Sequence, residues 1–295
     1  MAKITASLFT QLPEELHFKG APNDWVKMTR PGQNLHSFLE GPEFDADGNL
    51  YLVDVPYGRI FKITQLGEWQ LFYQYDGEPH SIKIDKNGDF IIVDYKLGLV
   101  KYAPKKNKLS TIVTAYNGVP FKGLSDLTIA ANGDYYFTDC GRTSLSNPTG
   151  CVYKYNNLDG LSLILNNVPY PNGIVTSPNG QSCFVAATRA NAVWKFKTNK
   201  PEPTYPMVGN YIQLTGGLGP DGLAINEDDK LAVAHAQKGR VYIYSPLGDL
   251  LLDIRLPQGL WVTSIAFQPK NQNELYIIEA QYGAIYRINI SVNES

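Results

Sequence analysis

A short turn signal recurs along this chain at a nearly constant interval, and this repeat limits the possible folds more than any other feature. The signal is an aspartate or asparagine followed by glycine between two runs of β-forming residues, which favours a type I′ hairpin turn. The clear copies are Asp47-Gly48, Asn87-Gly88, Asn132-Gly133 and Asn179-Gly180. Asp228-Asp229 and Gln272-Asn273 hold the same place in two further copies. The markers from Gly48 to Asn273 are 40, 45, 47, 49 and 44 residues apart, so the chain contains six copies of one unit.

Each unit holds material for four short strands. In the first unit, residues 49–54 follow the turn, residues 58–63 form a third β-rich segment, and residues 68–73 form a fourth. Four strands in a unit of this length indicate the blade of a β-propeller. No long segment shows the helical period of 3.6 residues, which excludes α/β architectures. The sequence therefore predicts an all-β fold, a six-bladed β-propeller with four-stranded antiparallel blades, as a single domain over residues 1–295.

A propeller must also close its ring. We expect an N-terminal strand around Ile4 to Phe9 to close it by joining the last blade. Residues 10–36, which include Pro13, Pro22 and Pro31, are then expected to form a loop over the channel.

Composition and charge exclude several classes of protein. Apolar residues make up 43% of the chain, which excludes a disordered protein. The net charge is −2 and no long basic block occurs, so we expect no nucleic-acid partner. No long apolar run occurs and residues 1–5 lack the apolar core of a signal peptide, so we expect no membrane contact. Three cysteines are too few for a disulfide framework, which favours a reduced, cytoplasmic protein. The oligomeric state stays open.

The phase of the repeat places two rings of polar residues at one end of the channel. The first ring lies near the start of each innermost strand and is polar in all six units. It consists of Glu40, His80, Ser125, Asn172, Asp221 and, after a one-residue slip, Ser264. The second ring lies near the end of the next strand. It consists of Asp54, Asp94, Asp139, Ala186, His235 and Glu279.

The first ring has the composition of a cation site. Glu40, Asn172 and Asp221 supply three hard oxygen ligands from units one, four and five. Such a set fits one divalent metal ion, calcium first, with magnesium, manganese or zinc as alternatives. Two crowded carboxylates repel each other unless a cation or a proton lies between them. The competing interpretation is that these residues only satisfy hydrogen-bonding groups that face a water-filled channel.

Five short motifs carry a resemblance to a known family. They are Leu39-Glu40-Gly41-Pro42, Ser125-Asp126-Leu127, Tyr136-Phe137-Thr138-Asp139, Pro171-Asn172-Gly173 and Pro220-Asp221-Gly222. Together they resemble the SMP-30/gluconolactonase family, and the likeness extends from about residue 37 to residue 288. The resemblance implies a six-bladed, metal-dependent lactonase that acts on a small lactone. It also implies that Glu40, Asn172 and Asp221 bind the metal.

The chain departs from the family pattern at two positions. Ser125 stands where the family usually has asparagine, and Gly123 stands where some sugar-lactone members have arginine. Both differences argue against an aldonolactone substrate. Neither affects the three metal ligands.

The remaining site predictions concern catalysis and substrate binding. A divalent ion can polarise the lactone carbonyl, and Asp221 is the candidate general base for the attacking water. Metal-bound hydroxide is the competing nucleophile, and the leaving group takes its proton from His80, His235 or water. Substrate-binding residues are predicted at Ser125, His80, Asp139, His235 and Glu279. For Asp139 and Glu279 the alternative is a buried carboxylate that accepts backbone N–H bonds.

Two other functions stay open. One is a non-hydrolytic cyclase or isomerase that uses the same propeller site, as in the strictosidine-synthase-like propellers. The other is a non-catalytic scaffold, because many propellers bind proteins. No Gly-x-Ser-x-Gly elbow occurs, so a serine hydrolase has no local support.

Overall fold

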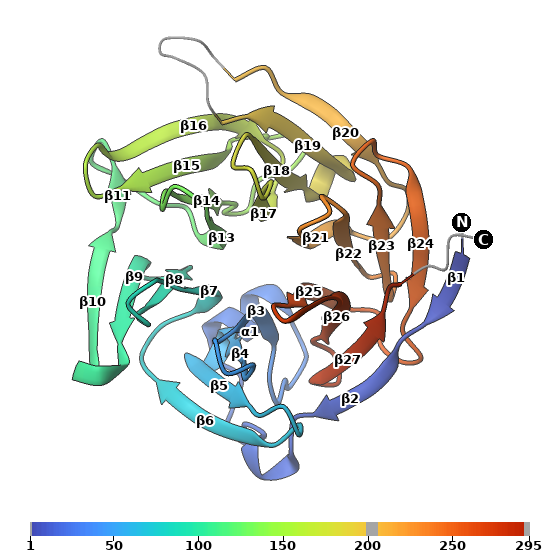
Figure 1. Cartoon of the computed structure of the whole chain (residues 1–295). Helices are drawn as coiled ribbons and strands as arrows, with labels where there is room; N and C mark the ends of the chain where they lie inside the picture. The colour runs from blue at the N-terminus through green and yellow to red at the C-terminus, as the bar shows by residue number, and fades with distance from the viewer. Residues whose placement is uncertain (1, 199–205, 292–295) are drawn as a thin grey trace.

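Six small sheets stand in a ring around a central channel in the computed structural model, which describes residues 2–198 and 206–291 (Figure 1). The predicted six-bladed β-propeller is confirmed. Within each blade the strands run antiparallel from the channel to the rim, in chain order. Blades one to three consist of β3 (Leu39–Phe44), β4 (Leu50–Asp54), β5 (Arg59–Ile63) and β6 (Trp69–Gln74); β7 (Pro79–Ile84), β8 (Phe90–Asp94), β9 (Gly98–Ala103) and β10 (Lys108–Val113); and β13 (Leu124–Ile129), β14 (Tyr135–Asp139), β15 (Gly150–Asn156) and β16 (Gly160–Val168). Blades four to six consist of β17 (Pro171–Thr176), β18 (Ser182–Ala187), β19 (Ala192–Lys197) and β20 (Gly209–Gln213); β21 (Gly219–Ile225), β22 (Leu231–Ala236), β23 (Arg240–Tyr244) and β24 (Leu250–Arg255); and β25 (Val262–Gln268), β26 (Asn271–Glu279) and β27 (Ala284–Asn289).

The N-terminal residues close the ring, and they do so on two blades. Strand β2 (Ser7–Gln11) pairs antiparallel with β27 and becomes the fourth strand of blade six, as predicted. Strand β1 (Ala2–Thr5) pairs in parallel with β24 and adds a fifth strand to blade five. The closing segment therefore links the last two blades at their outer edges.

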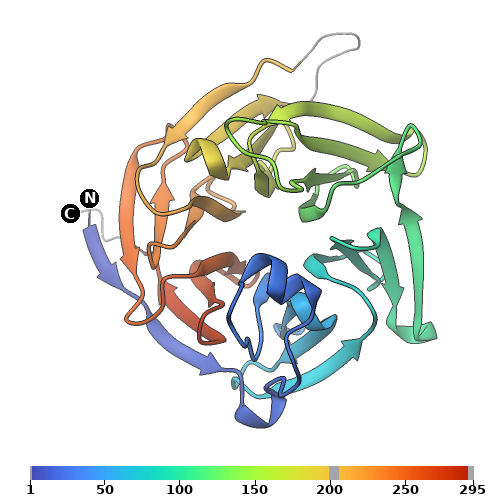
Figure 2. The ribbon, with the colours of Figure 1, turned by 180° about the vertical axis from the view of Figure 1, so that it is seen from behind.

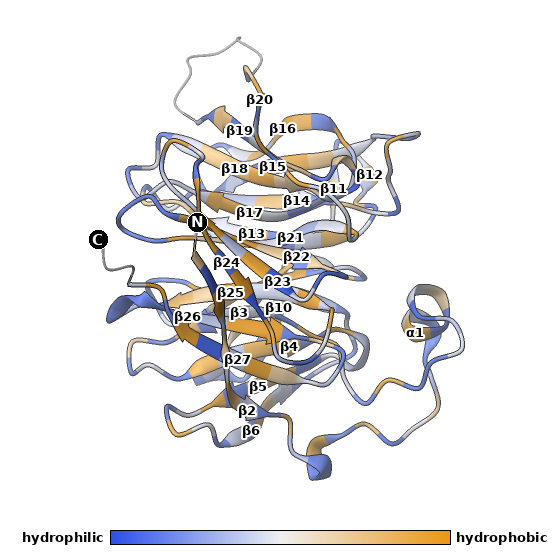
Figure 3. Cartoon of the chain, turned by 90° about the vertical axis from the view of Figure 1, so that its right-hand side faces the viewer, coloured by the Kyte–Doolittle hydropathy of each residue, from blue (hydrophilic) through white to orange (hydrophobic). Residues whose placement is uncertain are grey.

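The core lies between neighbouring sheets. The second strands of the blades are the most buried, and every residue of β4, β8, β18 and β22 is buried. Runs such as residues 90–93 consist of β-branched and aromatic residues, which pack well on pleated surfaces covered on both faces. Figure 3 shows apolar positions along the strands throughout the ring.

Five of the six hairpin turns sit where the repeat predicts, but their conformation differs from the type I′ turn. In the first turn Gly48 N–H donates to Asp45 O and only Gly48 has a positive φ, of 89°. This is a type I turn followed by a left-handed residue. Asp229 adopts the same conformation without being glycine, with φ of 58°. Residues 272 and 273 lie inside β26, because the sixth turn comes earlier, between Gln268 and Asn271.

Residues 10–36 are not a plain loop. Residues 10 and 11 belong to β2, and the segment contains the 3₁₀ helix η1 (Glu14–Leu16) and the helix α1 (Asp24–Thr29). The Asn23 side chain begins α1 by accepting a hydrogen bond from Val26 N–H at 3.0 Å. Trp25 and Val26 are buried against blades one and two. Helix α1 therefore stands on one face of the ring (Figures 2 and 3).

The remaining elements are a hairpin between blades two and three and three short helices that connect strands within a blade. They are the hairpin β11 (Ala115–Tyr116) and β12 (Val119–Pro120), and the 3₁₀ helices η2 (Val55–Tyr57), η3 (Pro104–Lys106) and η4 (Thr188–Ala190). No helix in the described ranges is both long and apolar enough to span a membrane.

Candidate functional site

A cavity of about 770 Å³ lies at the α1 end of the channel. Its walls come from the starts of the innermost strands, from residues 25–30 in and after α1, and from the loop over residues 141–146. Five residues predicted for the first ring line it, each from a different blade. They are Glu40, His80, Ser125, Asn172 and Asp221.

A bulge at the start of every innermost strand aims these side chains inward. The pairing between the first two strands shifts register at the same place in all six blades. In blade four the shift lies between Pro171 and Ile174, so Asn172 lies in the bulge. Bulges of this kind re-aim side chains and are common next to active sites. In blade six the bulge contains one residue, Thr263, and Thr263 instead of the predicted Ser264 takes the ring position.

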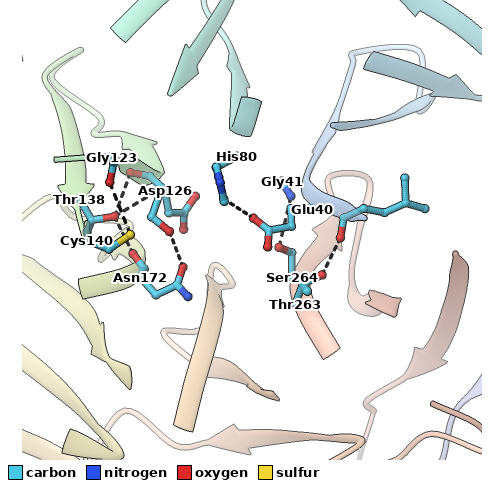
Figure 4. A network of polar contacts seen from close by, with 12 residues as sticks. Glu40, Gly41, His80, Gly123, Asp126, Thr138, Cys140, Asn172, Thr263 and Ser264 are labelled. Carbon is cyan, nitrogen blue, oxygen red and sulfur yellow. Dashed lines mark hydrogen bonds and ion pairs between the residues drawn. The ribbon is translucent and has the colours of Figure 1, made fainter. Parts of the chain in front are cut away.

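The sixth position does not contribute to the cavity wall. The Thr263 hydroxyl donates to Leu39 O at 2.8 Å, and the Ser264 hydroxyl accepts from Gly41 N–H at 3.2 Å. Both contacts join blade six to blade one (Figure 4). They hold the strand that carries Glu40 in place.

Glycines that follow the three candidate ligands bring the inner strands together. A Cβ atom on Gly173 would lie 2.3 Å from Asp221 O, and one on Gly222 would lie 2.8 Å from Ser264 Cα. These distances are shorter than real Cβ contacts allow, so only glycine permits such close approach. The Asn-Gly and Asp-Gly pairs of the sequence motifs are therefore needed to narrow the channel where the ligands lie.

Hydrogen bonds orient the first-ring side chains. His80 Nδ1 lies 2.8 Å from Glu40 Oε2, and the Ser125 hydroxyl donates to Asn172 Oδ1 at 2.8 Å. The Asn172 side chain lies close enough to Asp221 to lower the pKa of that carboxyl. In Figure 4, Glu40 and Asn172 face each other across the centre of the site.

The site concentrates negative charge. Burial raises the pKa of the Asp221 carboxyl well above its usual value, and the neighbouring Glu40 and Asp126 carboxylates raise it further. The Arg30 guanidinium opposes this effect. Burial acts to lower the pKa of His80, but the carboxylates of Glu40, Asp94 and Glu78 together outweigh burial, so that this pKa is raised. The arrangement favours a positive charge between the carboxylates.

The residues present fit an oxygen-preferring divalent cation. Two carboxylates, an amide oxygen and a hydroxyl converge on one cavity, and these are ligands that calcium and magnesium accept. His80 Nε2 is buried and finds no partner among the described residues, which leaves a nitrogen lone pair or donor unused beside Glu40. In the same ranges no three His, Cys, Asp or Glu side chains gather, so a site here depends on the Asn172 oxygen.

The structure does not bring three predicted substrate-binding residues, Asp139, His235 and Glu279, to the cavity wall. Asp139 accepts hydrogen bonds from the N–H groups of Lys122 and Gly123, and Glu279 accepts from those of residues 261, 281 and 282. They satisfy the backbone where each inner strand begins, which is the alternative stated above. Burial raises the pKa of both carboxyl groups.

His235 is also occupied elsewhere. Its ring is fully buried, and Nε2 lies 2.8 Å from Gly216 O. Burial lowers its pKa to about 4, so the imidazole is neutral at physiological pH. His235 therefore cannot donate a proton to a group in the cavity.

Sequence reasoning missed the cationic part of the wall. Arg30, Arg142 and Arg189 line the cavity, together with Tyr95 and Tyr170. None of these residues lies at a position of the repeat that would have indicated a place in the site. Trp25 and Trp261 also line the cavity.

A buried ion pair holds the α1 segment over the site. Asp54 accepts from Phe38 N–H at 2.7 Å and from Arg59 Nε at 2.7 Å. The same guanidinium donates to Leu16 O at 2.6 Å and to His36 O at 3.1 Å. Asp54 and Arg59 thus fix both ends of the segment that carries α1.

Comparisons with known proteins show what the chain as a whole is similar to. A sequence profile described as "SMP-30/Gluconolactonase/LRE-like region" matches residues 38–281. A lactonase, drp35 from Staphylococcus aureus (strain USA300), is 30% identical over 246 residues, which cover 77% of this chain and 72% of the relative.

Two solved structures share the fold. A gluconolactonase from Xanthomonas campestris superposes with a TM-score of 0.75 at 18% identity, covering 86% of each chain. The calcium-binding protein regucalcin from Agrobacterium tumefaciens superposes with a TM-score of 0.74 at 18% identity, covering 85% of this chain and 89% of that one. At this identity the likeness extends to the fold alone.

Proposed function

The chain belongs to the SMP-30/gluconolactonase/LRE-like family, and on that premise we propose that it hydrolyses a small lactone with the help of one bound divalent cation. The relative drp35 is a lactonase. The observation that carries the proposal is the convergence of Glu40, Asn172 and Asp221 from three blades on one cavity.

We assign the cation to Glu40, Asn172 and Asp221, with calcium as the first choice. When bound, a divalent cation polarises the lactone carbonyl and stabilises the negative charge that develops on its oxygen. Ser125 fixes the orientation of the Asn172 amide, because its hydroxyl donates to Asn172 Oδ1 and leaves one lone pair of that oxygen for a ligand.

The protein groups divide the proton transfers between them. Asp221 accepts a proton from the attacking water as the general base. His80 is held by Glu40 through Nδ1 and lines the cavity, so it is the candidate donor to the leaving oxygen, with water as the alternative. His235 drops out of this role because it lies outside the cavity wall.

The site differs from that expected for a sugar lactone. Gly123 has a φ of 144°, and a Cβ atom there would lie 2.1 Å from the Tyr95 ring. An arginine at this position, as some sugar-lactone members have it, would therefore displace Tyr95 from the cavity wall. This observation favours a substrate other than an aldonolactone, and it keeps a non-hydrolytic reaction in the same cavity as the second candidate.

A lactone panel in a pH-stat, run with and without chelator, tests the proposal. We expect acid release that stops in chelator and returns with calcium, magnesium, manganese or zinc. Asp221→Asn should lose turnover, whereas the control Asp228→Asn, whose side chain is 67% exposed, should keep it. Turnover that survives both chelator and Asp221→Asn would refute the role of the cation. No acid release from any lactone would favour the non-hydrolytic candidate.

A further inference from the structure

The arginines of this protein are distributed unevenly. The chain has seven, all within the described residues. Arg59, Arg240 and Arg287 form ion pairs with acidic side chains, and Arg255 is an exposed residue at the end of β24. The other three, Arg30, Arg142 and Arg189, line the cavity of the candidate site and form no ion pair with a described residue. No described lysine lines the same cavity.

Arg30 is held in place by aromatic rings. Its guanidinium carbon lies 3.5 Å from the centre of the Trp261 ring and 4.9 Å from that of Phe38. Stacking of this kind holds the planar group while its edge N–H donors stay free. The carboxylates of Glu40 and Asp221 lie close enough to act on its pKa, so Arg30 stands beside the proposed cation ligands.

Arg189 approaches the same place from blade four. Its guanidinium carbon lies 5.7 Å from the centre of the Tyr170 ring, and the Tyr170 hydroxyl also acts on Arg30. Tyr170 has a φ of 61°, which is strained for an aromatic residue. Arg30 and Arg189 therefore both lie near Tyr170, a side chain that the backbone holds in an unusual conformation.

Arg142 has a different contact. One of its terminal N–H groups donates to Met28 O at 3.0 Å, so it ties the loop over residues 141–146 to α1. It adds positive charge to the wall and anchors the segment that carries Arg30.

The charges of the cavity do not balance when a cation is bound. Among the described residues, only Glu40 and Asp221 are acidic side chains of its wall, and a divalent cation neutralises both of them. The three guanidinium groups are then left without a counter-charge. Such an excess inside a cavity attracts anions strongly, and arginine forks match the geometry of carboxylate and phosphate groups.

We propose that Arg30 and Arg189 bind an anionic group on the substrate, a carboxylate or a phosphate, that is separate from the lactone ester. The inference rests on the proposed function, since it names the class of lactone. In this arrangement the anionic group of the substrate lies between α1 and Tyr170. The lactone ester of the same substrate lies at the cation.

Binding of non-reactive anions tests this assignment independently of catalysis. Succinate and inorganic phosphate are titrated into protein loaded with magnesium, by calorimetry, for the wild type, Arg30→Gln, Arg189→Gln and the control Arg255→Gln. We expect binding in the wild type and in the control, weakened at least about tenfold in each cavity variant, which is the usual effect of losing one charged hydrogen bond. If only succinate binds, the anionic group of the substrate is a carboxylate. If only phosphate binds, it is a phosphate. Arg30→Lys and Arg189→Lys should restore part of the affinity, because they keep the charge and lose the fork. Equal affinity in all variants, or no binding of either anion, would overturn the proposal.

A matched pair of lactones provides the catalytic readout. A γ-butyrolactone with a free carboxylate on the ring is compared with its methyl ester. We expect a higher kcat/KM for the carboxylate, and we expect the ratio of the two values to fall about tenfold or more in Arg189→Gln through KM. Preference for the ester would contradict the anion site. If neither lactone nor any other is hydrolysed, the lactonase proposal fails, and the calorimetry still decides whether the arginines bind an anion.

Discussion

Replacing His235 by glutamine should reverse the order of stability between wild type and variant as the pH falls. In the folded protein the His235 ring is fully buried and its Nε2 contacts Gly216 O, while Nδ1 has no partner among the described residues. A proton on Nδ1 would add a buried charge with no acceptor. Burial accordingly lowers the pKa of His235 to about 4.

The sign and size of the effect follow from linkage. An unfolded histidine takes up a proton near pH 6.5, whereas folded His235 does so only near pH 4, so the unfolded state binds more protons between these values. The contribution of His235 to the free energy of unfolding is therefore fully present above pH 6.5 and is lost as the pH falls toward 4. At pH 4.5 the loss is about 2.5 kcal/mol, which screening by nearby solvent reduces to about 2 kcal/mol.

Glutamine retains a donor for Gly216 O and takes up no proton. At pH 7.5 we expect His235→Gln to cost about 1 kcal/mol, because it loses the packing of the imidazole against the Tyr242 ring, whose centre is 5.8 Å away. At pH 4.5 the variant should be more stable than the wild type by about 1 kcal/mol.

Urea unfolding at a series of pH values measures both free energies of unfolding. His36, whose pKa burial also lowers to about 4, titrates in both proteins and cancels in the difference. If the two free energies change in parallel between pH 7.5 and 4.5, His235 is not held neutral and the reasoning is wrong. The variant should also keep its cation-induced stabilisation, since His235 lies outside the cavity.

Three further predictions follow from the site and the ring. A divalent cation at about a hundred times its Kd should raise the free energy of unfolding by about 2.7 kcal/mol, and Asp221→Asn should abolish this rise in a thermal melt while Asp228→Asn keeps it. Asp139→Ala should destabilise the fold by about 1–3 kcal/mol, because two backbone N–H groups lose their acceptor, yet leave that cation-induced rise intact; a lost rise would place Asp139 in the site. Cys140, whose pKa burial raises to about 12, should not react with a thiol reagent at pH 8 in the folded protein and should react fully in urea, whereas rapid reaction in the folded protein would contradict its burial.

The repeat predicted the first ring well because a propeller places equivalent residues at equivalent radius. Once the period was known, Glu40, Asn172 and Asp221 had to lie at one end of the channel, however far apart they are in sequence. The one slip, Ser264 for Thr263, came from the hairpin of blade six, in which Thr263 and Glu279 lie 16 residues apart, whereas His80 and Asp94 in blade two lie 14 residues apart. Without an Asx-Gly pair, the sequence does not mark the ends of this longer hairpin.

The repeat could not predict the role of the second-ring carboxylates or the position of the arginines in the cavity wall. Asp139 and Glu279 have the same residue types as the candidate ligands, and only the direction of their side chains shows that they serve the backbone. Arg30 belongs to a segment that occurs once, so no second copy could indicate its place. Its position depends on the contacts of Arg59 with residues 16 and 36, which join distant parts of the chain.

The two-blade closure sets the order in which the molecule can be completed. Ser7 contacts Arg287, 280 residues later, so β2 finds its partner only after the strands of all six blades have been made. Contacts this distant in sequence slow folding. Until they form, β24 and β27 keep an unpaired outer edge that could recruit a strand from another molecule. Sealing the rim is thus expected to be the late, aggregation-sensitive step in the biogenesis of this protein, and chaperones that shield β edges should matter most at that stage.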